Sequence, residues 1–107
     1  MAWTVVYLNG AVQAEVEALS SDLRSKFQRI VELIKAKGLD QVREPYVKHL
    51  EGKLWEMRMI GRDGIARAIY VTASGQRVVI LHAFVKKMEK TPRRALETAR
   101  ARAKAVV

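Results

Sequence analysis

Residues 54–92 read LWEMRMIGRDGIARAIYVTASGQRVVILHAFVKKMEKTP, and the order of apolar and polar residues in this stretch decides the fold. Leu54–Ile60 alternates between the two kinds, which is typical of a half-buried β-strand. Ile65–Thr72 is rich in β-branched and aromatic residues, and Arg77–Val85 is the most apolar run of the chain. Turn sequences join these runs at Gly61–Gly64 and Ala73–Gln76. The stretch therefore predicts an antiparallel meander of three strands, with the last strand at the centre of a sheet.

The two sides of this meander are predicted to differ in charge. If Met57 and Met59 face the core together with Trp55, then Arg58 faces away from it. On the last strand, alternation places Val79, Leu81, Ala83 and Val85 on one side and His82, Phe84 and Lys86 on the other. Arg67 joins Arg58 and Lys86 on that second side if its strand pairs in register. Such a face suits a polyanion whose bases stack on an aromatic ring, but a solvated sheet face with extended cations has the same pattern.

The positive charge of the chain is unevenly distributed. The formal net charge is +9, and residues 77–107 hold nine Lys or Arg against two Glu. Residues 1–76 are nearly balanced, with eleven basic and nine acidic side chains. A concentrated positive field attracts nucleic acid, an acidic protein or an anionic membrane surface. Nucleic acid is favoured because the charge adjoins the basic sheet face, and an acidic protein partner is compatible with it.

Length and composition limit the other classes. A chain of 107 residues, half of them hydrophobic, is expected to form a single domain over residues 1–107. It has no cysteine, which excludes disulfides and thiolate metal sites. Neither a signal peptide nor a stretch of about 20 apolar residues for a membrane span is present, so the protein is expected in the cytoplasm.

The remaining segments predict helices on either side of the meander and two outer strands. Trp3–Leu8 is expected to form an outer strand, followed by helices at Ala11–Ala18 and Leu23–Lys37 that pair and cover the apolar face. Thr91 is expected to cap a final basic helix that runs to about Lys104, with Pro92 at its first helical position. A short strand is expected within Tyr46–Leu50, and three basic residues of this region could line an edge of the basic face: Lys48, His49 and Lys53.

Several kinds of catalytic site have no counterpart in the sequence. No Gly-rich phosphate loop or nucleophile motif occurs, and Glu56 is the lone carboxylate on the predicted basic face. His49 and His82 lack the spacing of metal ligands, so neither a metal nor a cofactor is expected. One metal-free reaction needs little more than cations and a proton acceptor: the attack of an RNA 2′-hydroxyl on its neighbouring phosphate.

Three segments carry a family resemblance: LWEMR at 54–58, IARAIYV at 65–71 and VVILHAFVKKMEKTP at 78–92. They resemble the phage Gp49-like branch of the RelE and HigB toxins, within the RelE/ParE superfamily of type II toxin–antitoxin systems. The resemblance implies an α+β fold with a RelE-like, microbial-RNase-like antiparallel sheet, a helical hairpin at the N-terminal end on one face, and a C-terminal helix. It also implies a ribosome-dependent mRNA endonuclease that inhibits translation, with mRNA, the ribosome and a helix-turn-helix antitoxin as partners.

The resemblance also implies roles for individual residues. Arg67 stands where the family has its phosphate-binding arginine, and Arg58 occupies a basic position of the preceding strand. Lys86 or Lys87 would stabilise charge or move a proton. His82 is either a further catalytic residue or a buried, hydrogen-bonded histidine, and the general base stays open. RNA would be bound by a further set of residues: Lys48, His49, Lys53, Phe84, Lys90, Arg93 and Arg94.

Two other functions remain open at this point. A ParE-like inhibitor of DNA gyrase uses the same fold, but the combination of Arg58, Arg67 and the lysine pair favours the nuclease. A non-catalytic RNA-binding module would show salt-dependent binding without cleavage.

Overall fold

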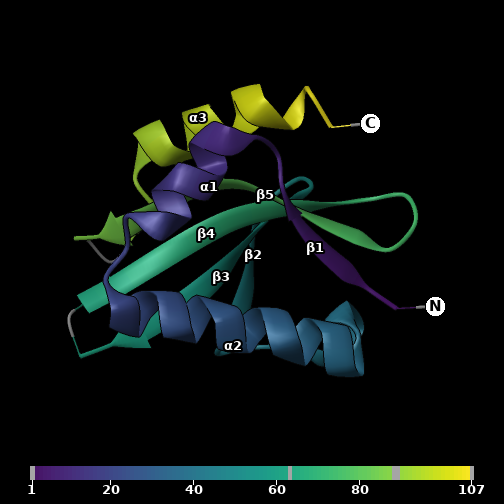
Figure 1. Ribbon diagram of the computed structural model, residues 1–107. Coiled ribbons are helices and arrows are strands. Elements are labelled where there is room, and N and C mark those ends of the chain that lie inside the picture. The colour runs from purple at the N-terminus through teal and green to yellow at the C-terminus, as the bar shows by residue number, and fades with distance from the viewer. Residues whose placement is uncertain (1, 63, 88–89, 107) are drawn as a thin grey trace.

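The computed structural model describes residues 2–62, 64–87 and 90–106 as one five-stranded sheet with helices on both faces (Figure 1). The strands are β1 Thr4–Tyr7, β2 Val47–Glu51, β3 Leu54–Gly61, β4 Gly64–Ala73 and β5 Arg77–Lys86. The helices are α1 Gly10–Glu17, α2 Ser21–Lys37 and α3 Arg93–Ala103, with a 3-10 turn η1 at Leu39–Gln41. No helix in the described part of the chain is both long and apolar enough to cross a bilayer.

The predicted meander is confirmed as β3, β4 and β5, which pair antiparallel in sequence order. The full sheet has the order β1-β5-β4-β3-β2, so β5 is an internal strand and β4, not β5, lies at the centre. The outer position predicted for the first strand is confirmed, because β1 pairs in parallel with β5 over Arg77–Ile80 alone. The predicted turn at Gly61–Gly64 contains Asp63, which lies outside the described residues. In the other turn Gly75 has a φ of 79°, a conformation that favours glycine.

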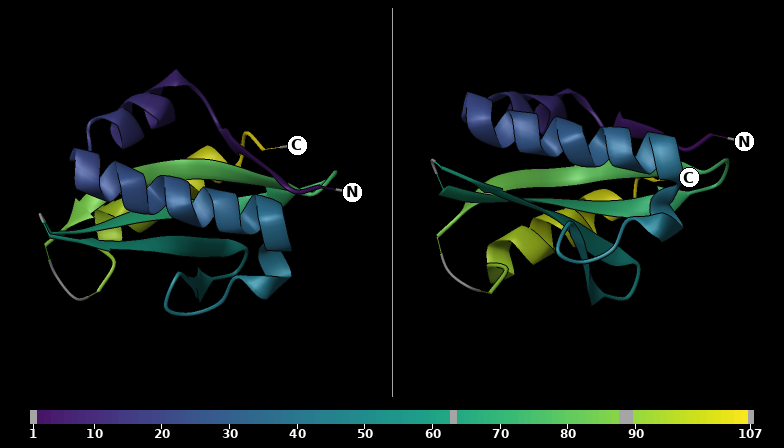
Figure 2. Two further views of the ribbon diagram at one scale, coloured as in Figure 1. Left: turned by 60° about the horizontal axis from the view of Figure 1, so that its bottom comes forward. Right: turned by 90° about the horizontal axis from the view of Figure 1, so that it is seen from below.

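Helices α1 and α2 cover one face of the sheet, as predicted, and α3 packs on the opposite face (Figure 2, right). The side chains of Asn9 and Ser20 accept hydrogen bonds at the N-termini of α1 and α2, which start both helices. Apolar residues at helical spacing on α2 meet the sheet in a buried cluster: Leu23, Phe27, Ile30, Val31 and Ile34 against Met57, Met59 and Tyr70. The α3 side has its own smaller cluster, in which Ala95 and Ala99 bring the helix close to Leu81.

An irregularity in β5 corrects the predicted facing of that strand. The register with β4 shifts by one residue between Ile69 and Tyr70, so that Leu81 has no partner opposite it. Before this bulge Leu81 joins the cluster under α3, and after it Ala83 joins the cluster under α1 and α2. The prediction that Leu81 and Ala83 share a side was therefore wrong, because simple alternation does not continue through a bulge. Phe84 and Lys86 still follow His82 at alternate positions on the α3 side.

The start of α3 also differs from the prediction. Pro92 is the N-cap residue, and none of the side chains that the structure describes caps the helix. The Thr91 hydroxyl instead donates a 2.9 Å hydrogen bond to Oε1 of Glu56 on β3. Thr91 therefore attaches the chain that enters α3 to the middle of the sheet.

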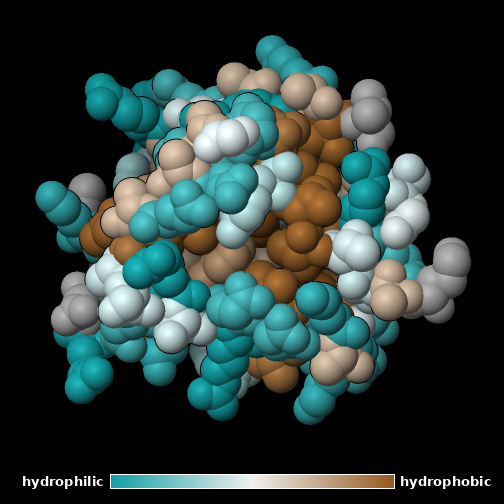
Figure 3. Space-filling view, viewed as in Figure 1, coloured by the Kyte–Doolittle hydropathy of each residue, from teal (hydrophilic) through white to brown (hydrophobic). Residues whose placement is uncertain are grey.

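One hydrophobic strip remains at the surface on the side of α1 and α2. Figure 3 shows it between the two helices, over β1, where Val6 and Tyr7 are partly exposed. It lies away from the basic face on the α3 side.

Candidate functional site

The sheet brings the predicted basic residues together in adjacent rows. Arg58 on β3 lies directly opposite Arg67 on β4, and Arg67 lies opposite Phe84 on β5. The neighbouring row contains Ile65 and Lys86. The prediction that Arg67 shares a side with Arg58 and Lys86 if its strand pairs in register is therefore confirmed. Helix α3 packs over the other end of this face, around Leu81 and Ile69, and leaves these rows beside it.

A buried carboxylate, Glu56, organises the centre of this face. Glu56 is 2% exposed, and its Oε2 lies 3.3 Å from Nε of Arg67 and 3.9 Å from Nε of Arg58. Its Oε1 accepts the hydrogen bond from Thr91. Glu56 thus joins β3, β4 and the start of α3 through one carboxylate. The sequence marked Glu56 as a lone acidic residue among cations, but alternation alone did not show that it is their shared counter-ion.

Arg67 is the most deeply placed of the cations. It is 2% exposed, and its Nη1 donates a 3.1 Å hydrogen bond to the carbonyl of Ala66. Burial lowers the pKa of the Arg67 guanidinium, the Glu56 charge opposes that shift, and Arg58 adds to it. Arg67 therefore supports Arg58 and Glu56 from within the fold, whereas Arg58 is 27% exposed and can reach a ligand.

A hollow of about 300 Å³ opens beside Arg58, between β2, β3 and the start of α3. Four cations line it: Lys48, Arg58, Lys86 and Lys90. Of its two carboxylates, Glu56 is paired as described, and Glu51 binds Arg100 through contacts of 2.7 and 2.8 Å. The hydrogen bonds from Arg100 lower the pKa of Glu51, although burial by itself would raise it. The hollow therefore has an excess of positive charge and suits an anionic group such as phosphate.

The other sequence candidates lie around this hollow at different places. His49 is among its lining residues, but its ring packs against Trp55 at 5.0 Å and its Nε2 lies 2.8 Å from the carbonyl of Gly52. Lys53 lines a separate hollow near Arg100. Lys87 is exposed just beyond β5, and two exposed arginines lie in the first turn of α3: Arg93, which pairs with Glu97 at 3.3 Å, and Arg94.

His82 belongs to a clamp on the edge of β5. Beyond Ile80 no strand within the described ranges pairs with this edge, and Glu15 of α1 lies there instead. Glu15 Oε1 lies 2.9 Å from His82 Nδ1 and accepts the Ala83 N–H at 3.1 Å. Arg102 of α3 donates to Glu15 at 3.0 Å and to the Leu81 carbonyl at 2.8 Å. This arrangement fits the structural alternative for His82, and the clamp holds the part of β5 that carries Phe84, whose ring stacks on His82 at 5.2 Å.

The clamp predicts a pH-dependent stability. Burial by itself raises the pKa of Glu15, but hydrogen bonds from His82, Ala83 and Arg102 outweigh it and hold the pKa below the ordinary 4.5. A carboxylate with a lowered pKa stabilises the fold fully above pH 4.5, and this contribution is lost as the pH falls through the lowered value. Glu15→Gln is therefore expected to cost about 1–2 kcal/mol near neutral pH and progressively less below pH 4.5.

Urea unfolding at a series of pH values measures this difference. Glu17→Gln, on an exposed position of the same helix, is the matched control. A Glu15→Gln penalty that stays constant through the acid range would show that the charge of Glu15 is not what stabilises the clamp.

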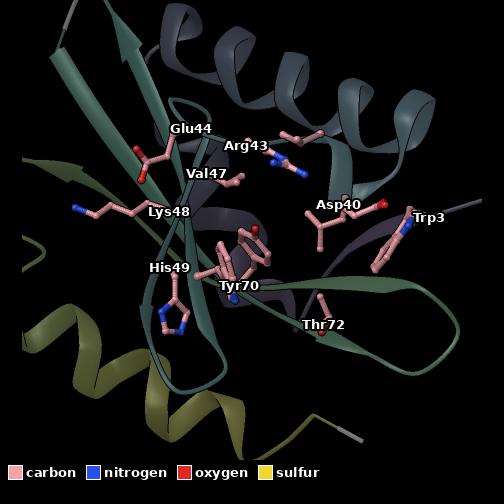
Figure 4. A pocket seen from close by; sticks show the side chains of 12 residues that line it. Trp3, Asp40, Arg43, Glu44, Val47, Lys48, His49, Tyr70 and Thr72 are labelled. Atoms are coloured by element: carbon pink, nitrogen blue, oxygen red, sulfur yellow. The ribbon is translucent and has the colours of Figure 1, made fainter.

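A larger hollow, of about 610 Å³, lies near the C-terminal end of α2 and has a different character (Figure 4). Its walls are mostly apolar and aromatic: Trp3, Leu39, Val42, Val47, Trp55 and Tyr70. Its rim mixes both signs of charge: Asp40 and Glu44 with Arg43 and Lys48. Burial raises the pKa of the Tyr70 hydroxyl well above its usual value, so this tyrosine stays neutral. This hollow lacks the positive excess of the site beside Arg58.

Comparison with known proteins identifies related sequences and a related fold. A sequence model of the family described as phage-derived protein Gp49-like matches residues 14–104. A chain in the crystal structure of the archaeal RelE–RelB complex from Pyrococcus horikoshii OT3 is 22% identical and superposes with a TM-score of 0.59. That match covers 81% of this chain and 98% of the archaeal one, which confirms the α+β, RelE-like fold. A search of curated proteins found no match.

Proposed function

This chain belongs to the Gp49-like family of phage-derived proteins, and we propose that it is the toxin of a type II toxin–antitoxin system that cleaves mRNA on the ribosome. The observation that carries the proposal is the hollow beside Arg58, where four cations line one cavity on a RelE-like sheet. Excess positive charge beside the aromatic ring of Phe84 is suited to RNA, because cations bind its phosphates and aromatic rings stack on its bases.

In the proposed metal-independent reaction, a 2′-hydroxyl loses its proton and its oxygen attacks the adjacent phosphorus. The bond from phosphorus to the 5′-oxygen breaks, and that oxygen takes up a proton, which leaves a 2′,3′-cyclic phosphate on one fragment and a 5′-hydroxyl on the other. Arg58 holds the scissile phosphate and stabilises the charge that develops on its oxygens. Lys86 and Lys87 follow Phe84 at the end of β5. One of the two stabilises the same charge or transfers a proton. Arg67 acts indirectly from its buried position. It neutralises the Glu56 carboxylate, so that the Arg58 guanidinium stays available to bind phosphate. Direct contact between Arg67 and phosphate would require Glu56 to give up its present partners.

The proposed partners are the ribosome, mRNA and a cognate antitoxin of the helix-turn-helix type, acting in the cytoplasm. The antitoxin is supported by the related archaeal RelE chain, which was solved as a complex with RelB. An acidic antitoxin surface would also complement the net charge of +9 on this chain.

One observation favours a second candidate, a non-catalytic RNA-binding module. Arg67 is buried and paired with Glu56, and His82 is held by Glu15, so two of the proposed catalytic side chains are engaged within the fold. Cations at the surface would then bind RNA without cutting it.

Mapping of RNA 5′ ends after a short induced pulse of the protein separates these functions. Arg58→Gln is expected to lower cleavage by about 10²–10³-fold, because it removes one group that stabilises the transition state. Arg24→Gln, an exposed arginine of α2 outside the hollow beside Arg58, should cleave as the wild type does.

Each result of this mapping has a distinct meaning. New ends inside translated messages, absent when translation is blocked and lost in Arg58→Gln, are the expected outcome. Growth arrest with intact messages would contradict it and point to a gyrase inhibitor. RNA binding without growth arrest would favour the non-catalytic RNA-binding module.

A further inference from the structure

A second basic hollow, of about 220 Å³, lies on the other side of Arg58. Seven residues line it: Lys26, Arg29, Ile30, Pro45, Tyr46, Arg58 and Ile60. Three of these are cations, and none of the lining residues in the described part of the chain is a carboxylate. Arg58 is the residue that this hollow shares with the first one. The two hollows therefore meet at one residue, Arg58.

The local backbone explains why a passage exists at this point. Strand β2 pairs with β3 over Leu54–Met57. From Arg58 onward, no strand in the described part of the chain pairs with the outer edge of β3. The N–H of Arg58 donates a 2.8 Å hydrogen bond to the carbonyl of Tyr46 instead, which fixes Tyr46 beside the strand edge. Lys26 and Arg29 approach the same edge from α2, on the opposite face of the sheet. The chain of cations thus continues around the edge of β3, from one face of the sheet to the other.

The cations of this second hollow are available to a ligand. Neither Lys26 nor Arg29 has an ion-pair partner among the described residues, in contrast to Lys35 on the same helix, which lies 3.8 Å from Glu32. Arg29 is exposed and Lys26 is half-buried, so a phosphate could reach both. Available cations without local carboxylates indicate an anionic partner.

The apolar members of the hollow indicate which anion fits. The Tyr46 side chain is 38% exposed and Ile60 is 60% exposed, next to the cations. A flat aromatic surface beside positive charge binds a nucleotide through its base and its phosphate together, and stacking on an aromatic ring tolerates any base. The volume of 220 Å³ is below the roughly 300–1,000 Å³ of pockets for separate small ligands, so it suits one part of a longer molecule.

We propose that the two hollows form one track for single-stranded RNA, which bends around the edge of β3 at Arg58. Lys26 and Arg29 hold phosphates beyond Arg58, and a base of that segment stacks on Tyr46. The inference rests on the proposed function for the identity of the RNA as message. It adds a binding subsite on α2, and it gives Tyr46 a role in holding the nucleotide next to the cleavage site.

Binding of 2′-O-methyl RNA oligonucleotides to the purified full chain tests the track, because such RNA cannot undergo 2′-hydroxyl attack. A long oligonucleotide can fill both hollows, whereas a very short one fills only the first. Lys26→Gln combined with Arg29→Gln is expected to reduce the salt dependence of binding to the long oligonucleotide, lowering the slope of log K against log salt by about 1.4, and to leave the short one unaffected. Arg24→Gln combined with Lys37→Gln removes the same charge from α2 outside the hollow and is expected to change neither.

Tyr46 supplies a second, independent readout. Tyr46→Ala is expected to weaken binding of the long oligonucleotide by about 5–150-fold, and Tyr46→Phe to keep the affinity, because stacking needs the ring and not the hydroxyl.

Three results would overturn the track. The first is equal behaviour of the two charge-removal pairs. The second is equal loss of affinity for the short and long oligonucleotides. The third concerns the variant that lacks both Lys26 and Arg29. If it binds RNA as the wild type does but no longer binds polyglutamate, a probe for acidic proteins, the second hollow binds an acidic protein and not RNA. A wild-type chain that shows the two-hollow pattern but cuts no message would overturn the nuclease and keep the track.

Discussion

Replacing Arg67 by methionine is expected to destabilise the protein by about 3–5 kcal/mol, the cost of leaving a buried carboxylate without its cation. Glu56 is 2% exposed and its nearest cation is Arg67 at 3.3 Å. Methionine fills much of the arginine volume but cannot neutralise the charge. Arg58, at 3.9 Å and partly exposed, is too distant to replace the lost pair. The variant therefore tests whether Arg67 acts first as a counter-ion inside the fold.

Chemical denaturation of single and double variants measures this effect. Arg58→Met should cost no more than about 1 kcal/mol, because its pair with Glu56 is long and partly in water. The double change Glu56→Leu with Arg67→Met should recover most of the loss, since removing both charges leaves neither one buried alone. A loss below about 1 kcal/mol for Arg67→Met would mean that the buried Glu56 carboxylate does not need Arg67 as its counter-ion.

The same pair matters for how the proposed catalysis is interpreted. An Arg67 variant that loses cleavage is ambiguous, because loss of folding and loss of a phosphate contact give the same result. Arg58 is the better probe of catalysis, since its removal is expected to leave the fold nearly intact. Because Arg67 is buried, its variants should first be tested for stability. Because Arg58 is partly exposed, its variants should first be tested for activity.

Much of the sheet was predictable because its strands and turns are determined by patterns among residues that are close together in the sequence. Alternation in Leu54–Ile60 and the turn residues that follow determine a meander, and helical spacing in α2 determines its buried side. The alignment of Arg58 with Arg67 followed from register alone. The RelE-like arrangement then placed the basic face opposite the helical hairpin.

The parts that were missed depend on contacts between distant residues. Thr91 reaches Glu56 across 35 positions of sequence, and Glu15 reaches His82 across 67. No periodic pattern encodes such contacts, so the sequence predicts a helix cap at Thr91 and no contact for Glu15. The bulge at Leu81 is likewise set by how β5 meets β4, and alternation could not reveal it.

The second hollow was missed for a related reason. Lys26 and Arg29 look like ordinary charges on the outer side of an amphipathic helix, where most cations are solvated. Their position next to Tyr46 and Arg58 depends on where β2 ends relative to β3. These charges are far apart in the sequence, and only the fold brings them together on one surface.

Salt dependence gives the largest expected effect on binding. Six cations line the two hollows together: Lys26, Arg29, Lys48, Arg58, Lys86 and Lys90. If each neutralises one phosphate of a single strand, log K should fall with log salt with a slope of about −4. Affinity for a long single strand should then drop about 300-fold between 50 and 200 mM salt.

Removing three of these charges should halve that response. The triple variant Lys48→Gln, Arg58→Gln and Lys90→Gln is expected to show a slope of about −2, which corresponds to a loss of about 20-fold over the same range of salt. Titration of a labelled oligonucleotide at several salt concentrations measures both slopes. A control that neutralises Arg24, Arg43 and Lys104, all exposed and outside both hollows, removes as much net charge from other surfaces.

The comparison of the two triple variants separates local contact from overall attraction. If RNA were held only by the net charge of +9, both variants would lose the same fraction of affinity and of slope. Contact within the hollows requires the first variant to lose slope and the control to keep it. A wild-type slope near −1 would contradict the track, because one neutralised phosphate cannot account for a surface on which cations from β2, β3, β5 and α2 converge.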